Sequence, residues 1–118
     1  MVAVLSASTL AGDEVKNAQG EKLGEVKEIM VDTENGRVAY AVLSFGGFLG
    51  MGDKLFAIPW SALHLGHDEH AFTLNVSKEA LQNAPGFDKD NWPDMADPTF
   101  GRGIYKHYGY TPYWEDVA

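Results

Sequence analysis

Residues 32–45 read DTENGRVAYAVLSF, a polar turn followed by a continuous apolar run. Asn35-Gly36 is the strongest short-range signal for a tight hairpin, because both residues tolerate the positive φ that such turns need. In the run that follows, both faces of a two-residue alternation are apolar, which is typical of a strand covered on both sides. The sequence therefore predicts a hairpin turn at 32–36 and a central strand over 37–45.

Shorter apolar runs, separated by glycine, proline and polar residues, flank this hairpin on both sides. Too few residues separate neighbouring runs for helical crossovers, so we expect a mainly antiparallel, all-β sheet of about six strands, closed as a small barrel or sandwich. Gly24 interrupts the alternation of its strand and predicts a β-bulge there. Ser77 predicts the N-cap of a short helix over 78–84. The expected strands cover residues 13–17, 21–31, 37–45, 54–59, 64–65 and 71–76.

The expected core is made of the apolar residues of these strands. Their burial would supply most of the free energy that favours folding, because apolar area removed from water is the dominant favourable contribution. The predicted core residues are Leu23, Val26, Ile29, Val38, Tyr40, Val42, Leu43, Leu55, Ile58, Leu74 and Val76.

Length, charge and composition exclude several classes of protein. The chain has 118 residues, which is the size of one domain. Its net charge is −8 and its basic residues are scattered, so we expect no binding to nucleic acid or to an anionic membrane surface. No apolar run approaches the ~20 residues of a membrane-spanning helix. Cysteine is absent, which excludes disulfides, thiolate metal sites and thiol catalysis. We expect a cytoplasmic protein.

Three segments of the chain resemble the PRC-barrel family. The first is GEKLGEVKEI at 20–29 with VD at 31–32 and GRVAYAV at 36–42. The second is GGFLGMGDK at 46–54 leading into IPWSAL at 58–63, and the third is VSKEALQNAPGF at 76–87. The resemblance covers about residues 8–87, and YGYTPYW at 108–114 is similar to the tails of stand-alone bacterial members.

The resemblance implies a compact, PRC-type β-barrel over 1–87 with an aromatic C-terminal extension over 88–118. The same fold occurs in the cytoplasmic part of the photosynthetic reaction-centre H subunit and in a ribosome-maturation factor that binds a ribosomal protein. In both, the barrel is an interaction module and not a catalyst. This chain shows neither the transmembrane helix of the first nor the RNA-processing domain of the second, so we expect neither specific role. The resemblance implies a protein-binding or assembly module.

The histidines give the main alternative. His64, His67 and His70 recur every three residues beside two acids, and a hairpin tip could bring two imidazoles and a carboxylate together for zinc or nickel. A solvated polar hairpin explains the same pattern. The alternative function is therefore a metal-binding protein or small enzyme centred on this hairpin. Otherwise we expect no metal, no cofactor and no enzymatic activity, since no Gly-x-Ser-x-Gly context is present and a small barrel offers little concave volume.

Aromatic residues are concentrated in the last quarter of the chain, where eight of the fourteen lie within residues 87–118. We expect little helical or strand periodicity in this segment, but an ordered one, because disordered tails are poor in aromatics. It could pack on its own barrel, on a second copy, or present rings to a ligand such as a sugar or a peptide. Together with the glycine-rich loop 46–52, it predicts a homodimer interface. The predicted interface residues are Phe48, Leu49, Met51, Trp92, Tyr108, Tyr110, Tyr113 and Trp114.

Overall fold

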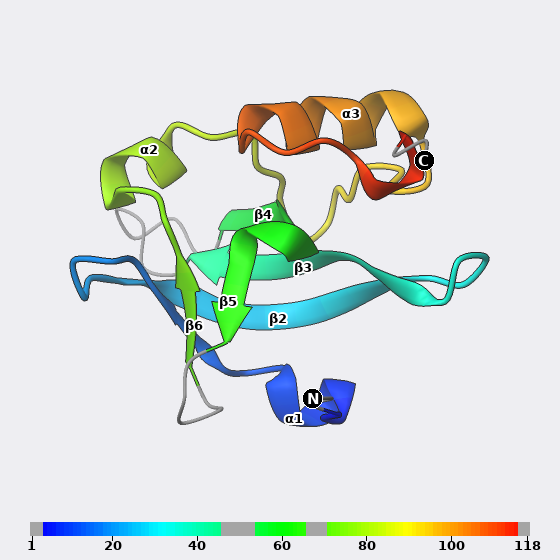
Figure 1. The fold of residues 1–118 in the computed structure, drawn as a ribbon. Coiled ribbons are helices and arrows are strands. Elements are labelled where there is room, and N and C mark those ends of the chain that lie inside the picture. The colour runs from blue at the N-terminus through cyan, green and yellow to red at the C-terminus, as the bar shows by residue number, and fades with distance from the viewer. Residues whose placement is uncertain (1–3, 46–53, 66–70, 116–118) are drawn as a thin grey trace.

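The fold is a six-stranded half-barrel with short helices packed around it (Figure 1). The structure, a computed structural model, describes residues 4–45, 54–65 and 71–115. The strands are β1 (Glu14–Lys16), β2 (Lys22–Asp32), β3 (Arg37–Phe45), β4 (Lys54–Pro59), β5 (Leu63–Leu65) and β6 (Ala71–Leu74). The helices are α1 (Ala7–Leu10), α2 (Lys78–Gln82) and α3 (Pro98–His107), with 3₁₀ turns η2 (Trp60–Ala62) and η3 (Tyr113–Glu115).

The strand order confirms the predicted fold class. The order is β4-β3-β2-β1-β6-β5, and every neighbouring pair is antiparallel except β1 with β6. The strand predicted to be central, β3, lies between β2 and β4. The strands at the two ends of the order, β4 and β5, are consecutive in the chain and are joined by η2. The fold is therefore mainly β, and its sheet is mostly antiparallel, as the spacing of the turns predicted.

The β-bulge predicted at Gly24 is present. Val15 pairs with Gly24 whereas the next residue, Lys16, pairs with Lys22, so β2 carries one extra residue at this point. Gly24 has φ +150°, and a Cβ atom there would lie 2.2 Å from the carbonyl oxygen of Ser44. Only glycine allows β3 to approach β2 this closely.

The inner face of the half-barrel holds an apolar core. Ala41, Leu43 and Phe45 of β3 point into it, as do Phe56 and Ile58 of β4. Eight of the eleven predicted core residues are buried, and the remaining three, Ile29, Val38 and Val76, are half-buried. Buried residues that the prediction omitted include Val15, Phe56, Phe72, Leu81, Ile104 and Tyr105.

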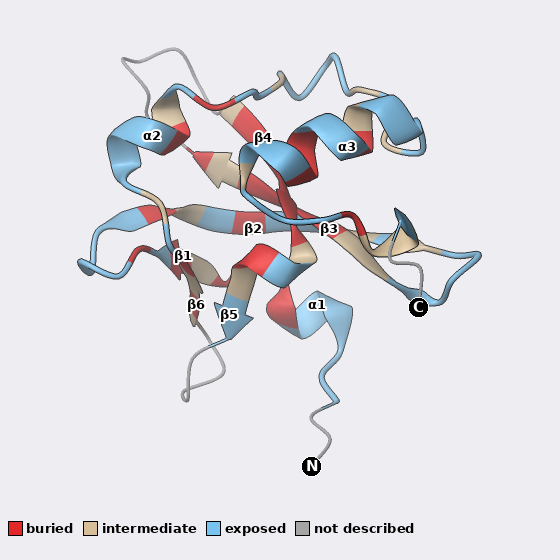
Figure 2. Cartoon of the chain, turned by 45° about the horizontal axis from the view of Figure 1, so that its top comes forward, coloured by how far each residue is buried: buried red, intermediate tan, exposed pale blue. Residues whose placement is uncertain are grey.

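The outer face of β3 and β4 is covered by α3, where the sequence was expected to show little periodicity. That expectation was wrong. Asp97 caps the helix by accepting a hydrogen bond from the Thr99 amide at 2.9 Å, and Pro98 occupies the first turn. Phe100, Ile104 and Tyr105 lie on one side of the helix, and the buried part of α3 faces the sheet in Figure 2. The helix is therefore amphipathic. Its apolar side covers the outer face of the sheet, and the inner core lies on the opposite face.

The two remaining helices, α1 and α2, are short. The predicted cap of α2 is confirmed, since the Ser77 side chain accepts a hydrogen bond from the Ala80 amide at 3.0 Å. This helix ends at Gln82, two residues before the predicted end. Helix α1 was not predicted from the sequence; it is a single turn that is capped by Ser6 and buries Leu10 against the inner core.

Candidate functional site

A layer of aromatic rings lies between the outer face of β3 and the C-terminal extension, and it forms the candidate site. We define the aromatic layer as Tyr40, Phe100, Tyr105, Tyr113 and Trp114. Their rings meet edge to face or tilted: the centroids of Tyr105 lie 5.6 Å from Tyr40 and 5.3 Å from Trp114. Tyr113 and Trp114 are 5.0 Å apart. This is the favoured geometry for aromatic pairs, so the rings form a packed layer within one chain.

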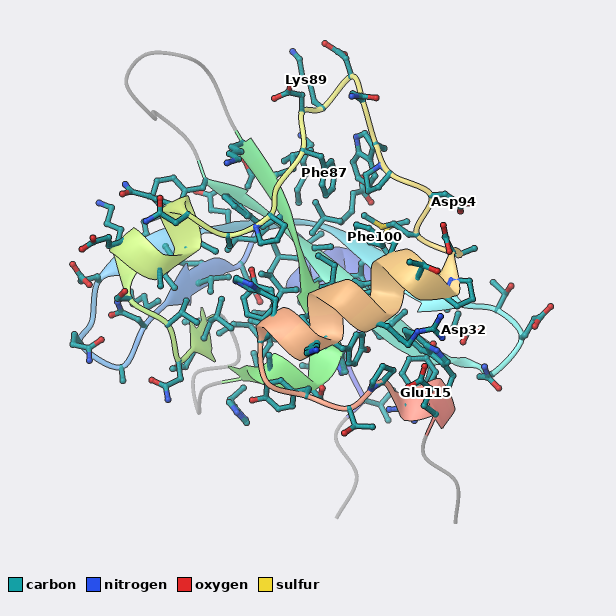
Figure 3. The ribbon with its side chains drawn as sticks, turned by 90° about the horizontal axis from the view of Figure 1, so that it is seen from above. Asp32, Phe87, Lys89, Asp94, Phe100 and Glu115 are labelled. Carbon is teal, nitrogen blue, oxygen red and sulfur yellow. The ribbon has the colours of Figure 1, made fainter. Side chains whose placement is uncertain are left out.

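Two tyrosine hydroxyls attach the extension to the sheet. Tyr105 donates to the carbonyl oxygen of Ala39 at 2.7 Å, and Tyr113 donates to a carboxylate oxygen of Asp32 at 2.5 Å. Both bonds connect residues more than sixty positions apart in sequence. Seen from above, the chain from Phe87 to Asp94 runs along one side of α3, and the segment ending at Glu115 runs along the other (Figure 3). The extension is therefore fixed to the barrel by specific polar contacts as well as by ring packing.

Close packing of the helix on this layer depends on Gly101. A Cβ atom at this position would lie 2.5 Å from a ring carbon of Trp114 and 2.6 Å from the hydroxyl oxygen of Tyr40. Two residues further on, Gly103 would meet nothing within 4 Å. The need for glycine thus arises on the side of α3 that faces the rings.

Asp32, at the base of the β2–β3 hairpin, is held in its ionised form. One carboxylate oxygen accepts from the amides of Glu34 and Asn35 at 3.0 and 3.1 Å, and the other accepts from the Asn35 side chain at 2.7 Å and from Tyr113. These hydrogen bonds lower the pKa of Asp32 from 3.8 to about 2, and the bond from the Asn35 side chain contributes most. Burial, and then the bond to Asp32, raises the pKa of Tyr113, so its proton stays on the phenol.

A pocket of about 560 Å³ opens between this hairpin and the extension. Its walls come from the end of β2, the hairpin turn, β3, the chain before α3, and η3. Met30, Tyr40, Met95, Tyr113 and Trp114 supply the large apolar and aromatic surfaces. The carboxylates at the pocket are Asp32, Glu34 and Asp97, of which the last two are exposed.

The predicted interface residues of the extension divide into two groups. Tyr113 and Trp114 are half-buried in the aromatic layer, and Tyr108 is half-buried beside it, where burial raises the pKa of its phenol. Trp92 and Tyr110 are 37% exposed each. Trp92 packs on Phe87 with centroids 5.1 Å apart. The predicted loop residues Phe48, Leu49 and Met51 lie outside the described residues.

The predicted histidine cluster falls mostly outside the described residues. His64 is exposed on β5, whereas His67 and His70 lie beyond what the structure describes. Within residues 4–45, 54–65 and 71–115, no three His, Asp or Glu side chains are grouped closely enough to hold a metal ion. The metal hypothesis therefore stays a prediction.

The residues that meet in and around the aromatic layer were not predicted from the sequence to lie together. Tyr40 was assigned to the core, and Asp32 was interpreted as a turn residue. The available signal was Asp97-Pro98, an N-cap followed by proline at the first helical position, with Gly109 at φ +83° just after the helix. Together these bracket α3 and place Phe100, Ile104 and Tyr105 on one face.

A comparison with family models matches the PRC-barrel domain to residues 3–81. The chain belongs to the PRC-barrel family. Comparison with curated proteins found no match. Membership of the family indicates a general interaction or assembly module. The match ends within α2, so the aromatic layer joins the family domain to a segment outside the matched residues. Among the described helices, none is long and apolar enough to cross a membrane.

Proposed function

We propose that this PRC-barrel protein is a non-enzymatic, cytoplasmic interaction module that binds protein partners and works as a homodimer. The family match over residues 3–81 carries the proposal. In this proposal residues 1–87 form the barrel domain, and residues 88–118 are an extension that shapes its binding surface.

The exposed aromatics support a contact surface on the extension. Most rings of this segment pack against other residues of the same chain, whereas Trp92 and Tyr110 are each 37% exposed. Tyrosine and tryptophan are enriched in interfaces because they combine a large apolar area with a polar tip. The net charge of −8 would keep such dimers soluble and apart from one another.

Light scattering at micromolar concentration tests the homodimer directly. We expect a mass near twice 12.9 kDa for the full chain. Substituting both Trp92→Ser and Tyr110→Ser should shift the protein towards monomer, with an unchanged far-ultraviolet circular dichroism spectrum. A monomer mass for the full chain would contradict the proposed homodimer.

Two further variants locate the interface. Phe48→Ser with Leu49→Ser probes the glycine-rich loop predicted to contribute to the dimer. Leu65→Ser, which changes a 37% exposed leucine on β5, is the matched control and should leave the dimer intact. If the control alone dissociates the dimer, the interface lies at the β5 edge and the extension has no part in it.

A further inference from the structure

The turn of the β2–β3 hairpin carries Asn35-Gly36, and Asn35 is the one asparagine of the chain that is followed by glycine. Both residues are exposed. Asparagine is a thermolabile residue, and a following glycine favours loss of its side-chain amide because glycine has no side chain to hinder the reacting backbone nitrogen. The other four asparagines precede alanine, valine or tryptophan. The sequence therefore favours deamidation at Asn35 over the other four positions.

Deamidation at this turn is a reaction between two neighbouring groups. The backbone nitrogen of Gly36 attacks the side-chain amide carbon of Asn35, a carbon–nitrogen bond forms, and ammonia leaves with the proton of the Gly36 amide. Water then opens the cyclic imide at either of its two carbonyl carbons, which gives aspartate or isoaspartate at position 35. Water is the one co-reactant, and it has access to this exposed turn.

Asp32 binds both reacting groups in the folded structure. Its backbone carbonyl oxygen accepts a hydrogen bond from the Gly36 amide, the nucleophile, at 2.9 Å. Its carboxylate oxygen Oδ2 accepts a hydrogen bond from the side-chain nitrogen of Asn35, the leaving group, at 2.7 Å. The reaction removes both donors, because the Gly36 amide loses its proton and the Asn35 nitrogen leaves as ammonia. The closed turn therefore protects Asn35, and the reaction proceeds from a locally opened turn.

The C-terminal extension binds the same carboxylate oxygen. Tyr113 of η3 donates to Oδ2 of Asp32 at 2.5 Å, so Tyr113 and Asn35 share one acceptor atom. Figure 3 shows Asp32 next to the segment that ends at Glu115. When η3 leaves the hairpin, the carboxylate that binds Asn35 loses one of its contacts and becomes freer to move. Opening of the turn is therefore coupled to undocking of the extension.

We propose that Asn35-Gly36 is a site of spontaneous deamidation and that docking of η3 on Asp32 slows the reaction. The product does not restore the original contact, because an ionised carboxylate at position 35 has no proton to donate to Asp32 and repels it as a like charge. The modified hairpin therefore holds η3 less tightly than the original one. Modification does not require the proposed homodimer, since a monomeric chain has the same turn and the same η3.

Mass spectrometry of the full chain, stored at neutral pH and physiological temperature, tests the site. Trypsin releases residues 28–37, in which Asn35 is the only asparagine, and residues 79–89, in which Asn83 is the only one. Replacement of the amide nitrogen by oxygen raises the mass of the peptide, and chromatography separates aspartate from isoaspartate. We expect both products at Asn35 and none above the level of the fresh chain at Asn83, which precedes alanine.

A synthetic peptide of residues 28–37, acetylated and amidated at its ends, gives the rate without the fold. We expect it to deamidate roughly thirtyfold faster than the full chain, which is the effect of losing two ordinary hydrogen bonds. Equal rates would show that the folded hairpin gives no protection. A full chain that stays unmodified after a storage time at which the expected slower conversion is complete would overturn the site itself.

Two tyrosine variants test the control by η3. Tyr113→Phe keeps the ring and removes the bond to Asp32, so Asn35 should deamidate about fivefold faster than in the parent chain. Tyr110→Phe changes a tyrosine of the extension that does not bond to Asp32, and it should leave the rate unchanged. Urea midpoints verify that both variants are folded. Equal rates in the two variants would show that docking of η3 does not control the reaction.

Asn35→Asp creates the aspartate product directly and tests its effect on docking. The Glu115 amide donates to the Pro112 carbonyl oxygen at 3.0 Å within η3, so its hydrogen exchange reports opening of this turn. We expect exchange at Glu115 about fivefold faster than in the parent chain, as for the loss of one hydrogen bond. The pKa of Asp32 should rise as well, because the largest contribution to lowering it is lost.

Asn83→Asp is the matched control for this variant. It adds the same charge at the C-cap of α2, outside the hairpin and the extension, and should leave exchange at Glu115 unchanged. Equal acceleration in both variants would show that net charge, and not the Asp32 contact, loosens η3. Exchange that is the same in Asn35→Asp as in the parent chain would overturn the coupling between the modification and the docking of the extension.

Discussion

The two faces of β3 are both buried, but by different means. The inner face, which includes Leu43 and Phe45, is covered mainly by apolar side chains of the neighbouring strands. The outer face is covered by α3 and η3, which come sixty to seventy residues later in the chain and bring tyrosine and tryptophan. The inner core thus follows from strand pairing, whereas the outer core depends on docking a separate segment.

The two cores are therefore stabilised by different interactions. The inner face buries apolar surface in a shape fixed by the β2–β3–β4 register. The outer face also needs hydrogen bonds that span the interface, such as those of Tyr105 to Ala39 and of Tyr113 to Asp32. Substitutions on the inner face should therefore lower the stability of the whole barrel, and substitutions on the outer face should act mainly through the extension.

The largest effect is expected from the inner face. Ile58→Ala removes a side chain that is fully buried against β3 and leaves a cavity, at a cost of about 2–4 kcal/mol in the free energy of unfolding. Urea denaturation followed by circular dichroism measures it. Val31→Ala, which trims a valine that is 54% exposed on β2, is the control and should cost less than about 0.5 kcal/mol. Similar midpoints for the two variants would contradict the inner core described here.

The next effect comes from a pair of glycines on α3. Gly101→Ala puts a methyl group against Trp114 and Tyr40, and this overpacking outweighs the gain in helix propensity, so we expect a net loss of about 1 kcal/mol. Gly103→Ala meets open space and should raise the stability by about 0.5–1 kcal/mol. Thermal unfolding compares the two. If both variants gain stability, α3 does not pack on the aromatic layer as closely as the structure shows.

The sequence predicted the inner half of the fold well, because its signals are local. Asn35-Gly36 fixed the hairpin, and the apolar run after it placed β3 in the centre of the sheet. Gly24 gave the bulge. These features depend on residues within a few positions of one another, so a single sequence contains them.

The outer half could be predicted only in part. The residues that bound α3, Asp97-Pro98 and Gly109, are visible in the sequence, but nothing local shows that Tyr105 reaches Ala39 or that Tyr113 reaches Asp32. The pocket is also not local, since its walls come from segments that only the fold brings together. The sequence indicated an ordered aromatic segment and left open what it packs against.

An effect smaller than the difference between the two glycine variants is expected from one hydroxyl of the outer face. Tyr105→Phe keeps the ring and removes the hydrogen bond to the Ala39 carbonyl, at a cost of about 1 kcal/mol. Tyr110→Phe, in a tyrosine that is 37% exposed, is the matched control and should change the stability by less than about 0.5 kcal/mol. Urea midpoints distinguish them, and equal midpoints would show that the Tyr105 bond adds nothing to the docking of α3.

The smallest effect concerns pH. The folded pKa of Asp32 is about 2, below its usual 3.8, so the bonds to its carboxylate favour the folded state above about pH 4 and are lost as the pH falls through 2. A carbon-detected NMR titration of the full chain should give the Asp32 pKa directly. In Tyr113→Phe one of its donors is lost and the pKa should rise towards 3.8, though not reach it, because the Asn35 side chain and the turn amides remain. Tyr105→Phe leaves those donors in place and should not move it. An Asp32 pKa that is the same in Tyr113→Phe as in the parent chain would mean that η3 does not dock on the hairpin, and that the turn alone holds this carboxylate ionised.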